Sequence, residues 1–343
     1  MKRKNIVTIG GGTGSFMLLR GLKKYPINLS AIVSMADDGG SAGVLRDELG
    51  VLPPGDARQC LTALSDSSEM LRKLMDYRFE GGKLKGHTFG NLFLSALEKI
   101  NGGFYRGVEA AAKILDVKGE VIPVSEENMR LRIELNSGKI LAGENQLDHN
   151  IEVRSHGIKR VFLRPQVRAH RRAVEKILSA DFVIIGPGDL HGSIIPNLIV
   201  TGISEAVRKT KAKIIFNCNL TNKKGQTENF SLDDYVNAVE KYIGRGRIGS
   251  VVFNNKKLNS DLADKYEKRE GRSSIVRIKD AVGDRSYEII SADVLNNKKI
   301  RRVKSDAISS TRSFIRHDSD KLAKVLMNIF RIKFSSQNNR RTV

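Results

Sequence analysis

The chain contains no tryptophan, and aromatic residues of all kinds make up only 6% of its 343 residues. Proteins that bind single-stranded nucleic acid commonly stack bases on aromatic rings, so this scarcity argues against nucleic-acid binding as the main function. Cysteine is equally scarce: Cys60 and Cys218 are the only two, and they lack the spacing of a metal-binding motif. We therefore expect two reduced and buried thiols, as is usual in a cytoplasmic protein.

Long hydrophobic runs are also missing. No apolar run reaches the roughly 20 residues that a membrane-spanning helix needs. The apolar segment that follows the basic start Met1–Lys4 is too short for the core of a signal peptide. The sequence therefore predicts a cytoplasmic protein without a membrane span.

Acidic residues are in the minority, with 38 Asp and Glu against 59 Lys and Arg, which gives a net charge of +21. Residues 251–343 alone hold 22 Lys and Arg and 11 Asp and Glu. Such an excess favours an anionic partner, which could be a nucleotide, a phosphorylated metabolite or a nucleic acid. The low aromatic content makes the nucleic acid the least expected of the three.

A glycine-rich loop follows the first apolar run of the chain, and a helical pattern of apolar residues follows the loop. Its residues are Gly10, Gly11, Gly12, Thr13 and Gly14. Glycines allow backbone N–H groups to face a phosphate, and the N-terminus of a helix adds positive charge. The spacing matches neither the dinucleotide fingerprint nor the P-loop. We predict that this loop binds phosphate; the alternative is a tight strand-to-helix turn that binds nothing.

A second loop of similar design follows the buried strand predicted at 181–185. It contains Gly186, Gly188 and Ser193, and one continuous helix is predicted from 194 to 207. The carboxyl ends of parallel strands in a doubly wound sheet face a common crevice, so we expect the two loops to meet there and to share a phosphate or a sugar. Asn217 and Asn219 end a later strand and could read a base or sugar edge, or cap a turn.

Carboxylates follow the second strand. Asp37 and Asp38 could hold Mg²⁺ or a ribose hydroxyl, although adjacent aspartates before Gly-Gly also form turns. Asp56 could join them at a metal, or it could form a capping box with Gln59 at a helix start. His87 and Asn91 lie four residues apart on one face of a predicted helix start, where they could serve a phosphate, a base or only local hydrogen bonds.

Alternating strands and helices predict an α/β fold: a Rossmann-like, doubly wound, mainly parallel sheet with helices on both faces. Alternation of apolar and polar residues about Asn136-Ser137-Gly138 predicts an inserted β-hairpin at about 130–147. A further strand is expected at 158–163. We predict one domain over 1–332 and a basic, disordered tail at 333–343.

Several motifs occur in one order along about residues 5–330. They are Gly10-Gly11-Gly12-Thr13-Gly14, Ala36-Asp37-Asp38-Gly39-Gly40-Ser41, Leu52-Pro53-Pro54-Gly55-Asp56, Gly86-His87-x-x-Gly90-Asn91, Gly186-Pro187-Gly188…Ser193-Ile194-x-Pro196-Asn197 and Arg316-His317-Asp318. In this order they resemble the CofD/YvcK family. One branch of that family is 2-phospho-L-lactate transferase, which moves a phospholactyl group from a guanosine diphosphate carrier to a deazaflavin alcohol with Mg²⁺. The other, the YvcK type, is a gluconeogenesis factor that binds UDP-sugars.

The Pro-Pro-Gly-Asp-x-Arg run that ends at Arg58 and the Arg-His-Asp ending are closer to the YvcK branch. The resemblance therefore implies a cytoplasmic regulator that binds a UDP-N-acetylglucosamine-type nucleotide sugar and links gluconeogenic growth to cell envelope synthesis and cell shape. The alternative is a Mg²⁺-dependent transferase in which Asp37, Asp38 and His87 are catalytic. In the YvcK branch, Tyr266 and Arg316 correspond to residues tied to UDP-sugar binding.

The residues predicted to bind ligand are Gly10, Gly11, Gly12, Thr13, Gly14, Asp56, Arg58, Asn91, Gly186, Gly188, Ser193, Asn197, Asn217, Asn219, Tyr266 and Arg316, with Asp38 and Asp56 as metal ligands. No flavin or nicotinamide prosthetic group is expected. A protein partner in envelope synthesis and a homo-oligomer are both compatible with the resemblance. Two segments depart from the family pattern: Ser15-Phe16 replaces Leu-Ser, and Asp189-Leu190-His191-Gly192 replaces Ser-Leu-Tyr-Thr, which adds a negative charge to the second loop.

Overall fold

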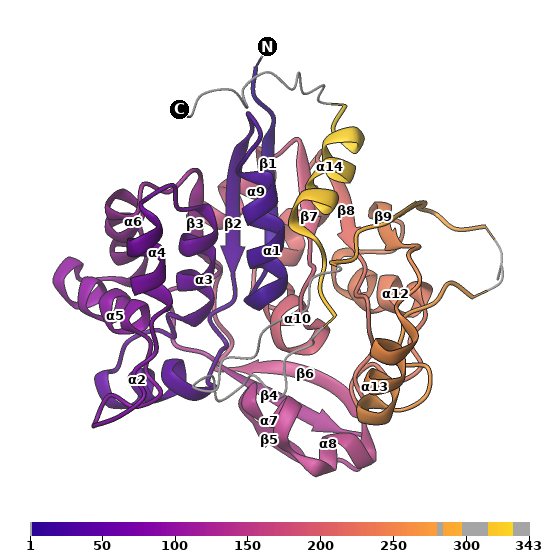
Figure 1. Ribbon diagram of the computed structural model, residues 1–343, viewed down its shortest axis with the longest axis horizontal. Coiled ribbons are helices and arrows are strands. Elements are labelled where there is room, and N and C mark those ends of the chain that lie inside the picture. The colour runs from indigo at the N-terminus through magenta and orange to yellow at the C-terminus, as the bar shows by residue number, and fades with distance from the viewer. Residues whose placement is uncertain (1, 280–283, 297–314, 332–343) are drawn as a thin grey trace.

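A computed structural model describes residues 2–279, 284–296 and 315–331 of the chain (Figure 1). The tail predicted at 333–343 lies outside the described residues, and the division into one domain over 1–332 stays a prediction. No helix in the described ranges is long and apolar enough to cross a membrane.

A seven-stranded sheet forms the centre of the molecule, in the order β10-β9-β8-β7-β1-β2-β3. All neighbouring strands in it are parallel. The strands are β1 (Asn5–Gly10), β2 (Asn28–Val33), β3 (Glu120–Pro123), β7 (Phe182–Ile185), β8 (Lys213–Asn217), β9 (Ile248–Asn254) and β10 (Glu288–Ala292). Strands β1 and β7 are apolar and almost wholly buried, as expected for strands covered on both faces. The predicted doubly wound α/β fold is confirmed.

The chain changes direction between β1 and β7. From β1 it moves outward to β2 and β3, then returns to β7 and moves outward to β8, β9 and β10. Right-handed crossovers place the helices of the two halves on opposite faces. On one side α1 (Gly12–Leu22) contacts α3 (Gly55–Leu64) and α14 (Ser319–Ile329); a second group is formed by α9 (Arg171–Leu178), α11 (Ile203–Lys209) and α12 (Leu232–Ile243), in which α11 contacts both of the others. Such a switch point is where open α/β sheets usually bind ligands.

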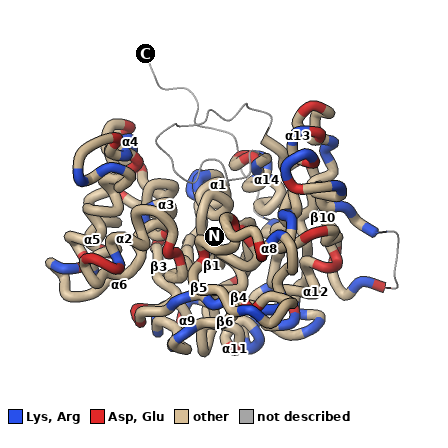
Figure 2. The backbone as a smooth tube through the Cα atoms, turned by 90° about the horizontal axis from the view of Figure 1, so that it is seen from below, with Lys and Arg blue, Asp and Glu red and all other residues tan. Residues whose placement is uncertain are grey.

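The remaining helices surround these two groups. They are α2 (Gly40–Leu49), α4 (Glu69–Asp76), α5 (Phe89–Asn101), α6 (Phe104–Ile114) and α13 (Ser260–Glu270). Lys and Arg are spread along these outer elements and along the inserted strands described below, so the positive charge lies mainly on the outside (Figure 2).

The inserted hairpin belongs to a larger unit than predicted. β4 (Arg130–Leu135) and β5 (Ile140–Ala142) form the expected antiparallel pair, and β6 (Ile158–Arg164) adds a third strand in the order β5-β4-β6. The hairpin itself lies within the predicted bounds of about 130–147, and β6 corresponds to the strand expected at 158–163. The helices α7 (Asn145–His149) and α8 (Ile151–His156) connect β5 to β6. One face of β4 buries Leu131, Ile133 and Leu135, and β6 covers the edge of β4 that β5 leaves open.

The helix predicted from 194 to 207 is interrupted. A π-helical turn, η1 (Leu190–Ile194), leads into the short α10 (Ile195–Leu198), and α11 begins only at Ile203. Gly202 separates α10 from α11 with a φ of +104°, which a regular helix does not allow. The apolar periodicity of the segment predicted helix correctly but not the break, because a single positive φ leaves the periodicity almost unchanged.

Candidate nucleotide-binding cavity

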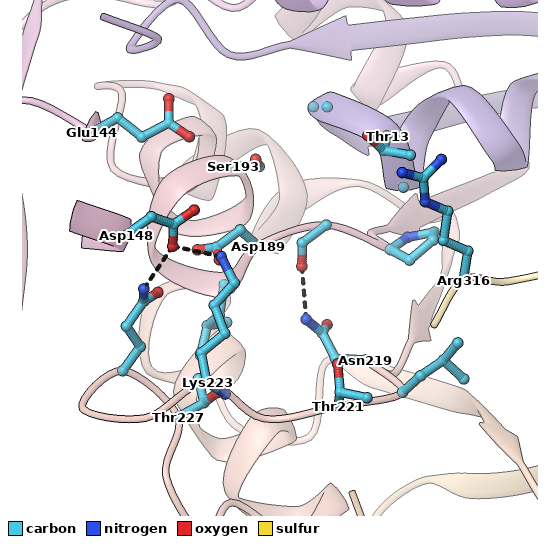
Figure 3. A pocket seen from close by; sticks show the side chains of 18 of the residues that line it. Thr13, Glu144, Asp148, Asp189, Ser193, Asn219, Thr221, Lys223, Thr227 and Arg316 are labelled. Carbon is cyan, nitrogen blue, oxygen red and sulfur yellow. Dashed lines mark hydrogen bonds and ion pairs between the residues drawn. The ribbon is translucent and has the colours of Figure 1, made fainter. Parts of the chain in front are cut away.

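A cavity of about 270 Å³ lies at the switch point between β1 and β7, and both glycine loops line it (Figure 3). From the first loop it is lined by Gly11, Gly12, Thr13 and Gly14, and from the second by Pro187, Gly188, Asp189 and Ser193. Gly10 and Gly186 precede these residues and do not line the cavity themselves. The loops that the sequence predicted to meet therefore do meet.

The two loops touch through their backbones at Gly14. A Cβ added to Gly14 would lie 2.3 Å from the carbonyl oxygen of Pro187 and 3.0 Å from the nitrogen of Gly188. Because real Cβ atoms do not approach a backbone so closely, a side chain at position 14 would push the loops apart. Glycine is required here by the close approach.

Three asparagine side chains fix the loop carbonyls. Asn197 Nδ2 donates to Gly10 O (3.2 Å), Asn217 Nδ2 donates to Gly186 O (3.2 Å), and Asn219 Nδ2 donates to Gly188 O (2.9 Å). Asn197 and Asn217 are fully buried, and only Asn219 lines the cavity. Of these three asparagines, only Asn219 is placed to contact a base or a sugar. Asn197 and Asn217 instead fix the conformation of the loops.

Asp56 binds the first loop directly. Its Oδ1 accepts a hydrogen bond from the N–H of Gly12, the first residue of α1, at 2.8 Å. A Cβ on Gly11 would meet Asp56 Oδ2 at 1.9 Å, so glycine at position 11 gives the carboxylate room. The capping-box interpretation of Asp56 is wrong: α3 begins at Gly55, before Asp56, and no side chain caps it. Asp56 instead stabilises the N-terminus of another helix.

The neighbours Asp37 and Asp38 point to different places. Asp37 lines the cavity, and its Oδ1 accepts from the N–H of Gly39 at 2.9 Å. Asp38 is not among the lining residues, because its Oδ1 accepts from the N–H of Asn145 at 2.9 Å. Asp38 therefore ties the loop after β2 to the start of α7.

The protein alone does not assemble a metal site in the ranges that the structure describes. No group of three or more His, Cys, Asp or Glu side chains there could hold an ion. The predicted ligands Asp38 and Asp56 do not both face the cavity. Since the residues present do not fit a resident Mg²⁺, no chemical step is derived through one.

Arg58, His87 and Asn91 form a hydrogen-bonded network with Ser41 beside the cavity. Arg58 Nε donates to Asn91 Oδ1 (3.0 Å), Asn91 Nδ2 donates to Ser41 Oγ (3.0 Å), and His87 Nδ1 lies 3.1 Å from the same oxygen. Arg58 also pairs with Asp76. None of these network residues lines the cavity. Their position joins the N-terminus of α2 to α3 and α5, and they do not reach the ligand space in this structure.

The late motif residues reach the cavity from the end of the chain. Arg316 and the fully buried Tyr266 both line it. The hydroxyl of Tyr266 accepts from Thr221 Oγ1 at 3.0 Å, and the guanidinium of Arg269 lies 4.8 Å from the centre of its ring. Tyr266 packs with Leu295 and Ile315 in a small apolar cluster. Tyr266 and Arg316, which the sequence analysis named as ligand-binding residues, thus line the same cavity.

Sequence reasoning missed one wall of the cavity. Glu144, Asp148 and Lys223 line it, and none belongs to a glycine loop. Lys223 Nζ lies 2.7 Å from Asp148 Oδ1 and 2.8 Å from Asp189 Oδ2 (Figure 3). Burial alone would lower the pKa of Lys223, but these carboxylates keep it above its usual value. Only the run Lys223-Lys224-Gly225 after a strand could have drawn attention to this side.

Glu144 has an unusual electrostatic environment. Burial and the nearby carboxylates of Asp37, Asp56, Asp189 and Asp148 raise the pKa of Glu144 well above its usual range. At Asp189 burial acts to raise the pKa, yet the charge of Lys223 and the N–H of Gly192 bring it below its usual value. Burial and neighbouring charge therefore shift the pKa values of Glu144 and Asp189 in opposite directions within one cavity.

Comparison with known proteins agrees with this architecture. The family model for 2-phospho-L-lactate transferase CofD matches residues 6–295. The gluconeogenesis factor of Bacillus subtilis (strain 168) is 36% identical over 332 residues, which span 96% of this chain and 99% of that protein. The gluconeogenesis factor of Halalkalibacterium halodurans is 40% identical over 278 residues, 80% of this chain and 85% of that protein. A crystal structure of a UPF0052-family protein from Bacillus halodurans, 35% identical, has a TM-score of 0.84 and covers 95% of this chain and 99% of that one.

Proposed function

The chain belongs to the CofD family, and on this premise we propose that its cavity binds a UDP-sugar of the UDP-N-acetylglucosamine type. The observation that carries the proposal is the meeting of two glycine loops over one cavity at the sheet's switch point. The N–H of Gly12 donates to Asp56, and the N–H groups that follow it in the first turn of α1 have no partners inside the helix. Together with the helix dipole, they suit a diphosphate.

Arg316 supports the same assignment. It lies across the cavity from Glu144 and Asp148, on the side where Thr13 opens α1 (Figure 3). A guanidinium can bind two phosphate oxygens at once, which suits a diphosphate better than a single charge does. In this arrangement the diphosphate lies between the start of α1 and Arg316.

The uridine and the sugar then occupy opposite parts of the cavity. Leu220, Tyr266 and Ile315 form an apolar border next to Arg316, which suits a flat base. Asp148, Gln226 and Thr227 form a polar border further away, which suits sugar hydroxyls. Asn219 lies in the loop between these borders and offers an amide oxygen without a hydrogen-bond partner among the described residues.

We further propose that binding has a regulatory purpose. Two relatives that match along most of the chain are named gluconeogenesis factor. Occupancy of the cavity would report the level of a UDP-sugar, and it would shift the population of the form that acts on a partner in envelope synthesis. Restored growth and cell shape on a gluconeogenic carbon source, in a Bacillus subtilis strain that lacks its own factor, would support this role. Failure of a well-expressed chain to restore either one would count against it.

A Mg²⁺-dependent transferase is the second candidate, because the matching family model is described as 2-phospho-L-lactate transferase. The residues named for that chemistry are dispersed: Asp37 lines the cavity, but Asp38 and His87 do not. Turnover of a nucleotide-linked phosphoester by the purified chain, lost in Asp37→Asn, would place this candidate first.

Calorimetric titration with UDP-N-acetylglucosamine tests the binding proposal. We expect saturable binding by the wild type, and binding weaker by about 10-fold or more in Arg316→Ala, since a charge-assisted hydrogen bond contributes roughly 1.5–3 kcal/mol. Arg171→Ala is the matched control, because the Arg171 side chain is 92% exposed on α9, outside the cavity. A folded wild type that shows no heat of binding refutes the proposal.

A further inference from the structure

The cavity has the opposite charge balance to the chain. The chain carries a net charge of +21, whereas the carboxyl groups that line the cavity outnumber the lysine and arginine side chains there. The carboxyl groups that line it are those of Asp37, Asp56, Glu144, Asp148 and Asp189. Lys223 and Arg316 are the lysine and arginine that line it, as far as the described residues go. An anionic ligand therefore meets a strongly uneven field inside this space.

Asp56 lies at the first loop, but three other acids lie on the side away from Arg316 (Figure 3). Glu144, Asp148 and Asp189, which we call the acidic wall, come from the inserted segment and from the loop after β7. Figure 3 shows Glu144 and Asp148 on one side of the cavity and Arg316 on the other. Because phosphates are placed at the Arg316 side, the acidic wall faces the far end of the ligand.

Lys223 does not turn this wall into an anion site. Its ammonium already pairs with Asp148 and Asp189, at 2.7 and 2.8 Å. Gln226 Nε2 donates to the same Asp148 oxygen at 3.0 Å, which fixes that carboxylate further. Two carboxylates against one ammonium leave a net negative charge.

Glu144 adds an unsatisfied carboxyl to the wall. A Cβ on Gly192 would lie 2.7 Å from Glu144 Oε1, so glycine in the π-helical turn makes room for it. Within the described ranges no hydrogen bond or ion pair engages the Glu144 carboxyl. Asn219, which also lines the cavity, has a buried Oδ1 that likewise lacks a hydrogen-bond partner among the described residues. These groups are matched by the O–H donors of a polyol.

We propose that the acidic wall selects nucleotide sugars whose sugar is uncharged and rejects those whose sugar carries a carboxylate or a phosphate. The inference rests on the proposed function, because it assumes that the phosphates bind at the glycine loops. Sugar hydroxyls can donate to Asp148 and Asn219 and exchange hydrogen bonds with Glu144. A second anion would instead lie against Asp148 and Asp189, whose counter-ion is already engaged. Specificity then arises from repulsion of the wrong ligand as well as from attraction of the right one.

A matched pair of ligands isolates this effect. UDP-glucose and UDP-glucuronate differ only at the sugar C6, which is a hydroxymethyl group in one and a carboxylate in the other. We expect calorimetry at pH 7.5 to show that wild type binds UDP-glucuronate at least about 10-fold more weakly than UDP-glucose. In Asp148→Asn the gap should narrow to about 3-fold or less, because Lys223 then faces a single carboxylate.

Two further variants complete the test. Glu144→Ala removes a carboxyl that exchanges hydrogen bonds with the sugar, so it should lose affinity for UDP-glucose, and unchanged affinity in the folded variant would overturn that contact. Glu48→Gln removes an exposed acid of α2 outside the cavity and should leave both affinities and their ratio unchanged. Thermal unfolding of each variant shows whether it is folded.

The possible failures are distinguishable. If wild type binds both ligands equally well, the inference is overturned and the proposed function stands. If the discrimination is present but survives unchanged in folded Asp148→Asn, its assignment to the acidic wall is overturned. If folded wild type binds neither of these ligands but does bind UDP-N-acetylglucosamine, this inference is overturned and the proposed function stands; if it binds none of the three, the proposed function falls, and this inference with it.

Discussion

The two glycine loops look alike in sequence, but the structure uses them differently. In the first loop, the N–H of Gly12 is bound by Asp56, a residue 44 positions away on α3. In the second loop, Asp189 Oδ1 accepts from the N–H groups of His191 and Gly192 of its own turn, at 3.1 and 2.7 Å. Both loops therefore hold a carboxylate at backbone N–H groups. The first takes it from a distant element, and the second supplies its own.

This difference assigns the loops different tasks. The first leads into the regular helix α1, whose dipole points at the cavity. The second leads into a π-helical turn whose N–H groups already donate to Asp189. It therefore contributes the charged side chain of Asp189 to the cavity, and fewer of its N–H groups can bind a phosphate. A glycine-rich pattern alone does not say which of these tasks a loop performs. The predictions that follow test the contrast, starting with the largest expected effect.

Removing the contact between the loops should have the largest effect. In Gly14→Ala the new methyl group would overlap the carbonyl of Pro187, at 2.3 Å. We expect the free energy of unfolding to fall by about 3 kcal/mol, at the upper end of the usual cost of overpacking, and UDP-sugar binding to be lost. Chemical denaturation measures the change. Gly81→Ala is the control, because a Cβ there meets nothing within 4 Å; equal stability of the two variants would mean that the loops do not touch.

The second loop depends on a charge partner. Lys223→Met leaves Asp148 and Asp189 without their ammonium. We expect a loss of about 2 kcal/mol, less than for a fully buried pair, because all three side chains keep some solvent contact. Urea unfolding of Lys223→Met and of the neighbouring, exposed Lys224→Met gives the comparison. If both variants lost the same unfolding free energy, the ion pairs of Lys223 would make no specific contribution to stability.

The conformation of the first loop depends on the hydrogen bond from the Gly12 N–H to the carboxylate of Asp56. Asp56→Ala leaves the Gly12 N–H without its acceptor in a part-buried position, which should cost about 1–2 kcal/mol of unfolding free energy. Asp56→Asn keeps an amide oxygen in place and should recover most of this loss. Were Asn no better than Ala at this site, the hydrogen bond to the loop would not be the stabilising contact.

The second loop should also show a modest dependence on acid that the first lacks. Burial lowers the pKa of His191 from 6.5 to about 4. Below pH 6.5 the unfolded chain takes up a proton that the folded one refuses, so His191 lowers stability as the pH falls toward 4. His317, with a pKa of about 4 for the same reason, adds a similar contribution. The urea midpoint of His191→Gln should fall less between pH 7 and about 4.5 than that of wild type; an identical fall would place the His191 pKa near its ordinary value.

Local patterns were enough for the framework of the site. The apolar runs before Gly10 and Gly186 predicted two buried parallel strands, and the glycines after them predicted loops at one crevice. These features depend on neighbours in the sequence, and the structure has both loops at one cavity. Local sequence could not distinguish two possible roles of Asp56. Its spacing to Gln59 is typical of a helix cap, but its carboxylate binds the N–H of Gly12 at the start of α1.

Contacts between distant segments account for what was missed. Glu144 and Asp148 lie in the insertion, which carries no phosphate-loop pattern, and they reach the cavity because Asp38 and Gln226 hold that segment beside the main sheet. Arg58 belongs to one sequence motif, and His87 and Asn91 belong to another, yet the three join in a hydrogen-bonded network with Ser41 and do not line the cavity.

The sequence by itself determined the order of strands and helices, the doubly wound class and the two glycine loops, because each follows from short-range periodicity and backbone freedom. Only the tertiary structure decided which carboxylates face the cavity, which asparagines hold loop carbonyls and which carboxylates pair with Lys223. Those outcomes depend on burial and on the distances between side chains that are far apart in the chain. Neither quantity is encoded in local spacing.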